Sequence, residues 1–178
     1  MRIGIRQYLG TVAVILCPLV CFSQSTQLAD SLNRRGMDFY EGGQYRQAEF
    51  YLHEAFQLYQ EHGEPDVWLI PGVDYAEILV DRAKYEQALE LFNRLNKVAV
   101  AQKNMRARAR IENDLGWAYN TMGKNKIALN HLQRALPLAE KSQDTLRLGY
   151  IYNNIGSVYY RRGDYKSSLE YREKSLYF

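Results

Sequence analysis

A period of 40 residues runs through most of this 178-residue chain and restricts the folds it can adopt. When the sequence is written in rows of 40, one column contains only glycine or alanine, and the column three residues later contains only Phe, Leu or Tyr. The first column holds Gly36, Ala76, Gly116 and Gly156, and the second holds Phe39, Leu79, Tyr119 and Tyr159. Self-similarity at a fixed period of this length indicates stacked copies of one supersecondary unit.

Each unit is expected to contain two helices joined by a tight turn. A glycine in the middle of a helix costs about 1 kcal/mol relative to alanine, so its recurrence in the first column predicts a close helix crossing. Seven residues later, Gly43, Gly123 and Gly163 suit a left-handed turn residue after the first helix. Between Tyr85 and Leu95, apolar residues recur at spacings of three and four, which predicts a second helix with one buried stripe.

The segments between units carry signals for helix ends. Gly63, Asn104 and Asp144 fall where one hairpin stops and the next begins. Asn and Asp side chains at a helix start accept hydrogen bonds from the free amides of the first turn, so Asn104 and Asp144 are predicted amino-terminal caps. Pro71 is expected near a helix start, where its missing amide hydrogen is tolerated.

The composition supports an all-α globular chain. Hydrophobic residues make up 47% of the sequence and charged residues 24%, which is enough to bury a core. The chain has four prolines, and it is rich in straight-chain residues, which lose little rotamer freedom in a helix. Disorder and an extended sheet are therefore both disfavoured.

The amino terminus has the features of an export signal. It begins with positive charge, residues 9–20 are almost wholly apolar, and Cys21 and Ser23 offer small side chains at the positions a signal peptidase inspects. We predict a signal peptide over residues 1–23, with cleavage before Gln24, and hence a periplasmic or secreted protein. Two alternatives tether the chain to a membrane: a retained anchor, for which the apolar run is short, and a lipid on Cys21.

Cleavage would also change the bulk properties of the chain. Both cysteines lie in the signal, and two arginines leave with it, so the net charge falls from +3 to +1. The mature chain, residues 24–178, is therefore expected to have no disulfide and no general attraction for nucleic acid or anionic lipid.

The third and fourth units resemble the tetratricopeptide repeat. The third has Leu115, Gly116, Trp117, Ala118 and Tyr119 followed by Gly123, Ala128, Leu132 and Ala135; the fourth has Ile155, Gly156, Ser157, Val158 and Tyr159 followed by Gly163, Tyr165 and Leu169. The period of 40 is similar to a longer variant in cell-polarity adaptors, kinesin light chains and bacterial sensor proteins, whereas the usual repeat has 34 residues. The resemblance implies an all-α, right-handed superhelical solenoid of antiparallel helix pairs. About four repeats are expected at 29–68, 69–108, 109–148 and 149–178, the last incomplete.

The resemblance also implies a binding groove for a protein or peptide. In the family, the first helix of each repeat lines a concave surface, and amide and aromatic side chains suit it because they pair with backbone groups and give large contact areas. The corresponding positions are Asn33, Met37 and Tyr40 in the first repeat, Asn113, Asp114, Trp117 and Asn120 in the third, and Asn153, Asn154, Ser157 and Tyr160 in the fourth. The alternative is that these asparagines only cap or solvate helices. Asn33 and Met37 also argue against the carboxylate clamp of chaperone-binding members.

Catalysis has little support in the sequence. There is no glycine-rich phosphate loop, no histidine pair spaced for a metal, and no cysteine in the predicted mature chain. His53, His62 and His131 are scattered and are interpreted as surface or helix-flank residues. We therefore expect no enzyme activity, no cofactor, no metal and no small-molecule substrate.

Two functions of different classes fit these expectations. The first is a non-enzymatic exported scaffold that binds a protein or peptide partner in its groove. The second is the amino-terminal sensory region of a membrane-bound signal transducer, of the histidine-kinase or regulator type. The last helix has apolar residues, Leu176 and Phe178 among them, and no capping helix after it. We interpret this end as part of a longer chain, with self-association or a differently covered helix as alternatives.

Overall fold

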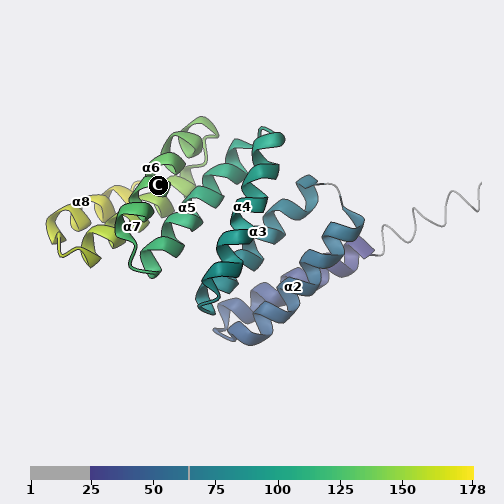
Figure 1. Ribbon diagram of the computed structural model, residues 1–178. Helices are drawn as coiled ribbons and strands as arrows, with labels where there is room; N and C mark the ends of the chain where they lie inside the picture. Colours follow the sequence, from purple (N-terminus) through teal and green to yellow (C-terminus); the bar gives the residue numbers. More distant parts are fainter. Residues whose placement is uncertain (1–24, 64) are drawn as a thin grey trace, which may run out of the picture. The chain divides into compact units, whose positions relative to one another are not determined.

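The computed structural model describes residues 25–63 and 65–178, so the predicted signal peptide over residues 1–23 lies outside it. All regular secondary structure in the described residues is helical (Figure 1). A first helix covers residues 25–41 and is followed by α2 (Tyr45–His62), α3 (Pro65–Asp81), α4 (Tyr85–Ala101), α5 (Met105–Thr121), α6 (Asn125–Lys141), α7 (Thr145–Arg161) and α8 (Tyr165–Ser175). The predicted all-α architecture of helix pairs is confirmed.

The helices keep a constant register along the chain. Each begins 20 residues after the one before it, so the helix pairs begin at residues 25, 65, 105 and 145. These starts lie four residues before the repeat boundaries predicted from the sequence. No described helix is both long enough and apolar enough to span a bilayer.

The chain divides into two compact units, residues 1–71 and 72–178, with the boundary inside α3. In the first unit, the helix over residues 25–41 packs on α2 around a small core of Ala29, Ala55 and Tyr59. The Phe39 and Tyr51 rings stack with their centroids 5.2 Å apart, which adds a second contact between these two helices.

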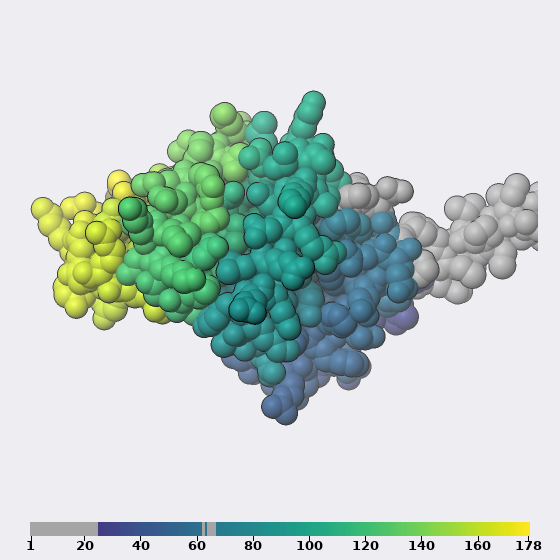
Figure 2. All heavy atoms as spheres, viewed as in Figure 1, coloured from purple at the N-terminus to yellow at the C-terminus, as the bar shows by residue number. Residues whose placement is uncertain are grey.

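In the second unit, α5 packs on α6, α6 on α7, and α7 on α8, and α5 also contacts α7. The core lies between these helices, with Leu132 of α6 against Ile151, Ile155 and Val158 of α7, all at most 3% exposed. Figures 1 and 2 show this part of the chain in green to yellow. Burial of apolar side chains at about 25 cal/mol per Å² holds the hairpins together.

The small-residue column lies at the predicted helix crossings. A Cβ atom added to Gly116 would come within 2.6 Å of Leu132 Cγ, and one added to Gly36 within 2.8 Å of the Leu52 side chain. Gly156 is as tight, since its added Cβ would lie 2.9 Å from Arg172 Cγ. The close approach inferred from the sequence is therefore confirmed.

The turns and caps follow the predicted chemistry. Gly43, Gly123 and Gly163 have φ values of +69°, +74° and +78°, the left-handed conformation that glycine adopts at little cost. The side chains of Asn104 and Asp144 accept hydrogen bonds from the amides three residues later, at 2.9 and 3.0 Å. Both predicted caps are confirmed.

Gly63 lies at a helix end, as the sequence predicts, but Pro71 does not lie at a helix start. Gly63 follows α2 directly as its carboxyl-terminal cap, in an extended conformation. Pro71, expected near a helix start, instead lies in the second turn of α3, because α3 begins at Pro65. Pro137 likewise lies inside α6.

Candidate partner-binding face of the second unit

The predicted groove residues of the third and fourth repeats lie on two contacting helices, α5 and α7. Their exposure divides them into two groups. Asn113, Asp114 and Asn120 are buried, with 3 to 4% of their surface exposed. Trp117, Asn154 and Ser157 are half-buried, and Asn153 and Tyr160 are exposed.

Two of the buried residues, Asn113 and Asp114, belong to a chain of polar contacts that begins on α3. Arg110 of α5 donates through Nη2 to Asp74 Oδ1 and, at 3.2 Å, to Glu77 Oε1, both on α3. Its Nε atom lies 3.6 Å from Asp114 Oδ2, one turn further along α5. The guanidinium thus joins three carboxyl groups from two helices.

The same chain continues from α5 to α7. Asn113 Nδ2 donates to Asp114 Oδ1 at 2.8 Å, and Asn154 Nδ2 of α7 donates to Asn113 Oδ1 at 3.0 Å. Arg147 Nη1 of α7 lies 3.8 Å from Asp114 Oδ1. We call the set the polar ladder; it consists of Asp74, Glu77, Arg110, Asn113, Asp114, Arg147 and Asn154.

Burial and the contacts within the ladder shift the pKa values of three of its members, Asp74, Glu77 and Arg110. Burial raises the pKa of Asp74, and Arg110 partly offsets this effect. Burial and then the Asp114 carboxylate raise the pKa of Glu77 to about 8. Burial opposes the charge of Arg110, but the carboxylates of Glu77, Asp74 and Asp114 outweigh it and raise the pKa of this guanidinium. At neutral pH, Glu77 is therefore mostly protonated.

The polar ladder fixes the first helices of successive repeats against one another. A buried charge is costly unless it is paired and hydrogen-bonded, so the contacts of Arg110 define one arrangement of α3 and α5. Because Asn113 and Asn154 bond to each other, their amides are already engaged. We call these two residues the floor of the surface formed by α5 and α7. The exposed residues of the two helices remain available to contact a partner.

The exposed part of the face is aromatic and amide in character. Tyr160 is 56% exposed, and its ring packs edge-on against Tyr165 at 5.4 Å between centroids. Tyr150, which the sequence prediction did not include, is half exposed, with the Arg147 guanidinium 5.3 Å from its ring centre. With Asn153 and Trp117, these side chains form what we call the α5–α7 face.

Sequence reasoning did not find Asp74, Glu77, Arg110 or Arg147. One available signal was the position two residues before the small-residue column, which is polar or charged in all four repeats. It holds Arg34, Asp74, Asp114 and Asn154. The other was α3 itself, where two carboxyl groups interrupt an otherwise apolar run. Charges in such a helix indicate buried partners.

The first-repeat positions belong to the first unit. Asn33, Met37 and Tyr40 are half-buried in the helix over residues 25–41. Within the described residues, the Asn33 Oδ1 atom is buried and accepts no hydrogen bond.

One histidine differs from its expected role. His131 is not a surface residue: its side chain is 15% exposed, its Nδ1 atom lies 2.8 Å from Glu112 Oε2, and its ring stacks on Tyr119. Arg134 also reaches Glu112, at 3.1 Å. These contacts join α5 to α6 inside one hairpin. His53 is exposed beside Glu54, and the side chain of His62 lies outside the described part of the structure.

The fold and the α5–α7 face define a class of protein built from stacked helical hairpins. Two sequence profiles described as tetratricopeptide repeat match residues 72–141 and 148–178. The chain belongs to the tetratricopeptide repeat family. No curated protein matches the sequence.

Several solved structures share the fold. Aspartyl phosphate phosphatase F from Bacillus subtilis is 22% identical with a TM-score of 0.73, over 85% of this chain and 40% of that one. The apo form of RapI is 21% identical with a TM-score of 0.67, over 86% and 43%. A putative kinesin light chain from Podosopora anserina is 16% identical with a TM-score of 0.67, over 85% and 74%. This chain thus spans less than half the length of the first two proteins.

Proposed function

We propose that the protein is a non-enzymatic scaffold that binds a polypeptide along the α5–α7 face. The observation that carries the proposal is the exposure of Tyr150, Asn153 and Tyr160 along α7, the helix that supplies Arg147 and Asn154 to the polar ladder. Exposed tyrosines give large contact areas with little loss of side-chain entropy, and asparagine can pair with both donors and acceptors of a backbone. A rigid floor beneath them lowers the entropic cost of binding.

The face suits a partner segment of low charge. The positive charges of Arg110 and Arg147 lie within the ladder, beside the carboxyl groups of Asp74, Glu77 and Asp114. The exposed residues of the face are neutral. The partner is therefore expected to bind through apolar contact and backbone hydrogen bonds, with weak dependence on salt.

The place of action is part of the proposal. The basic start and apolar run within residues 1–23 support export, and an exported scaffold would meet its partner outside the cytoplasm. Cell fractionation with a carboxyl-terminal tag tests this, because a cytoplasmic protein that retains residue 1 would contradict it. If the gene product continues into a membrane span and a kinase, the same face would serve a sensory role.

A pair of matched double variants tests the binding face. After in-cell cross-linking identifies the partner, we expect Asn153→Ala with Tyr160→Ala to weaken binding by about tenfold or more, as loss of exposed aromatic anchors does at other interfaces. The control is Asn93→Ala with Tyr45→Ala, which removes the same side chains from other helices. It should bind as the wild type does. Equal affinity of all three proteins for the partner, with unchanged helical circular dichroism, would show that the α5–α7 face does not bind it.

A further inference from the structure

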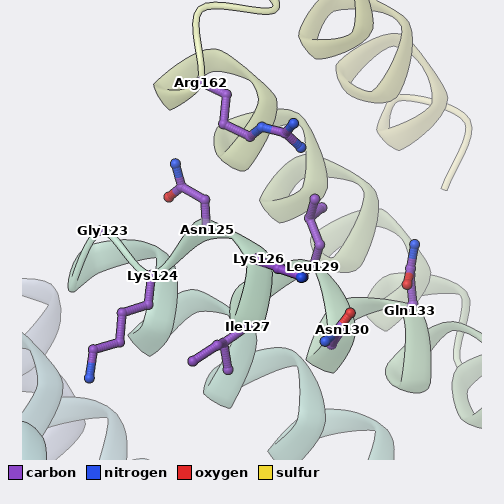
Figure 3. Close-up of a pocket in the computed structure, with 9 residues that line it drawn as sticks. All are labelled: Gly123, Lys124, Asn125, Lys126, Ile127, Leu129, Asn130, Gln133 and Arg162. Carbon is purple, nitrogen blue, oxygen red and sulfur yellow. The ribbon is translucent and has the colours of Figure 1, made fainter.

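A hollow lies beside α6, the second helix of the third repeat, and none of the residues that line it belongs to the polar ladder. Its volume is about 810 Å³, and its walls come from the turn before α6, one side of α6 and the residue after α7. In Figure 3, Arg162 extends over the space that Asn125, Leu129 and Gln133 enter from α6, while Lys124 points away from it. The hollow is open, so it suits a chain segment rather than an enclosed small molecule.

The side chains around this hollow carry positive charge and amide groups. Lys126, Asn130, Gln133 and Arg162 are all exposed, and none of the residues that line the hollow is acidic. In the described part of the chain, neither Lys126 nor Arg162 takes part in an ion pair. The Arg162 guanidinium lies 5.7 Å from the Tyr159 ring centre, which holds it in place while leaving N–H groups available.

The nearest acidic neighbour of Arg162 is engaged elsewhere. Asp164 accepts hydrogen bonds from the Ser167 amide at 3.1 Å and from the Ser167 hydroxyl at 2.7 Å, as the amino-terminal cap of α8. These bonds lower the pKa of Asp164. Both carboxylate oxygens of Asp164 are thus bonded to Ser167 at the start of α8, while their charge also attracts Arg162 without forming an ion pair with it.

The preceding repeat provides an internal comparison. Forty residues earlier, the positions of Lys126, Asn130 and Arg162 are occupied by Glu86, Glu90 and Met122. Both repeats form helices with the same register, so the hairpin fold does not require cations at these positions. Relative to the second repeat, the third thus has basic and amide residues in place of acidic ones, although basic residues also stand at the Lys126 position in the first repeat, Arg46, and in the fourth, Lys166.

From these observations we infer that the hollow binds an acidic, extended segment of a partner protein. Carboxylates of the segment pair with Arg162 and Lys126, whose N–H groups form charge-assisted hydrogen bonds. Asn130 and Gln133, on the same side of α6, bond to its backbone, and Leu129 contacts its aliphatic atoms. This surface is separate from the α5–α7 face and uses different chemistry, so either can exist without the other.

Fluorescence anisotropy with a labelled peptide of alternating Asp and Ser tests this inference. We expect the full chain to bind this peptide, and to bind the same peptide with Asn in place of Asp at least about tenfold more weakly, because the charge-assisted bonds are lost. Raising the salt concentration should weaken the binding of the Asp peptide.

A variant that carries the residues of the second repeat locates the site. Lys126→Glu, Asn130→Glu and Arg162→Met together should weaken binding of the Asp peptide by about tenfold or more. The control makes the same exchanges on exposed positions of α4: Lys97→Glu, Asn93→Glu and Arg94→Met. It has the same net charge and should lose less than about threefold. Circular dichroism of both variants should match the wild type, since these residue types occur at equivalent helix positions.

Three results would overturn the inference. The first is equal loss in the two triple variants, which would mean that only net charge matters. The second is equal binding of the Asp and Asn peptides. The third is tighter binding of a single-stranded oligonucleotide than of the Asp peptide, which would assign the hollow to a different class of partner.

Discussion

Glu77 has a carboxyl group whose pKa lies well above its ordinary value. Burial and the Asp114 carboxylate raise its pKa from an ordinary value of 4.5 to about 8, and Asp74 shifts in the same direction. The folded state therefore binds a proton that the unfolded state releases above pH 4.5. This proton stabilises the fold fully below pH 4.5, and the stabilisation is lost as the pH rises through about 8.

We predict that the free energy of unfolding falls between about pH 5 and about pH 8, by at most about 1.4 kcal/mol per pH unit for the proton on Glu77. Glu77→Gln, which keeps the shape without the ionisation, should flatten this slope, leaving the smaller contribution of Asp74. Urea unfolding at several pH values measures the slope of the free energy of unfolding against pH. Glu140→Gln, at an exposed position of α6, is the control and should keep the wild-type slope. Identical slopes for Glu77→Gln and wild type would show that this carboxyl group is not protonated in the fold.

At the scale of single elements, most of the fold could be predicted from the sequence. The columns of Gly116 and Gly123 predict the crossing and the turn because each glycine answers a local steric demand. Asn104 and Asp144 likewise satisfy amides within their own helices. The start of α3 was harder to place, because Pro71 is acceptable both at a helix start and in the second turn of a helix with apolar neighbours.

The polar ladder could not be predicted in the same way. Its contacts between helices join residues 33 to 41 positions apart, such as Arg110 to Glu77 and Asn154 to Asn113. Periodicity identifies which side of a helix faces its partner, but it does not show which polar side chains approach within hydrogen-bond distance. The predicted groove residues therefore include both floor residues such as Asn113 and exposed residues such as Tyr160.

The helix crossing of the third repeat gives a prediction at the element scale. Gly116→Ala should destabilise the protein by about 1 to 3 kcal/mol, because the added Cβ lies 2.6 Å from Leu132 Cγ and the clash outweighs the better helix propensity of alanine. Gly149→Ala is the matched control, since its nearest neighbour would be 3.4 Å away. It should be neutral or stabilising. Chemical denaturation compares the two, and a stabilised Gly116→Ala variant would refute the close crossing.

The whole molecule contains two units, and the larger one carries both surfaces discussed above. The core around Leu132 and Ile151 lies entirely in residues 72–178, as does the polar ladder. We predict that residues 65–178, which keep α3 intact, fold alone with a helical circular dichroism spectrum and a cooperative melting transition. A fragment that is unfolded at 25 °C would show that the second unit depends on the first.

Site-specific photo-cross-linking in the native host tests whether the α5–α7 face binds a polypeptide. A photoreactive phenylalanine analogue is placed at Ser157 on α7 and, as a control, at the exposed Asn93 on α4. We expect a defined cross-linked protein from position 157 that is absent from position 93 and is lost when Tyr160→Ala is added. The same cross-linked species from both positions, or from position 157 regardless of Tyr160, would contradict it.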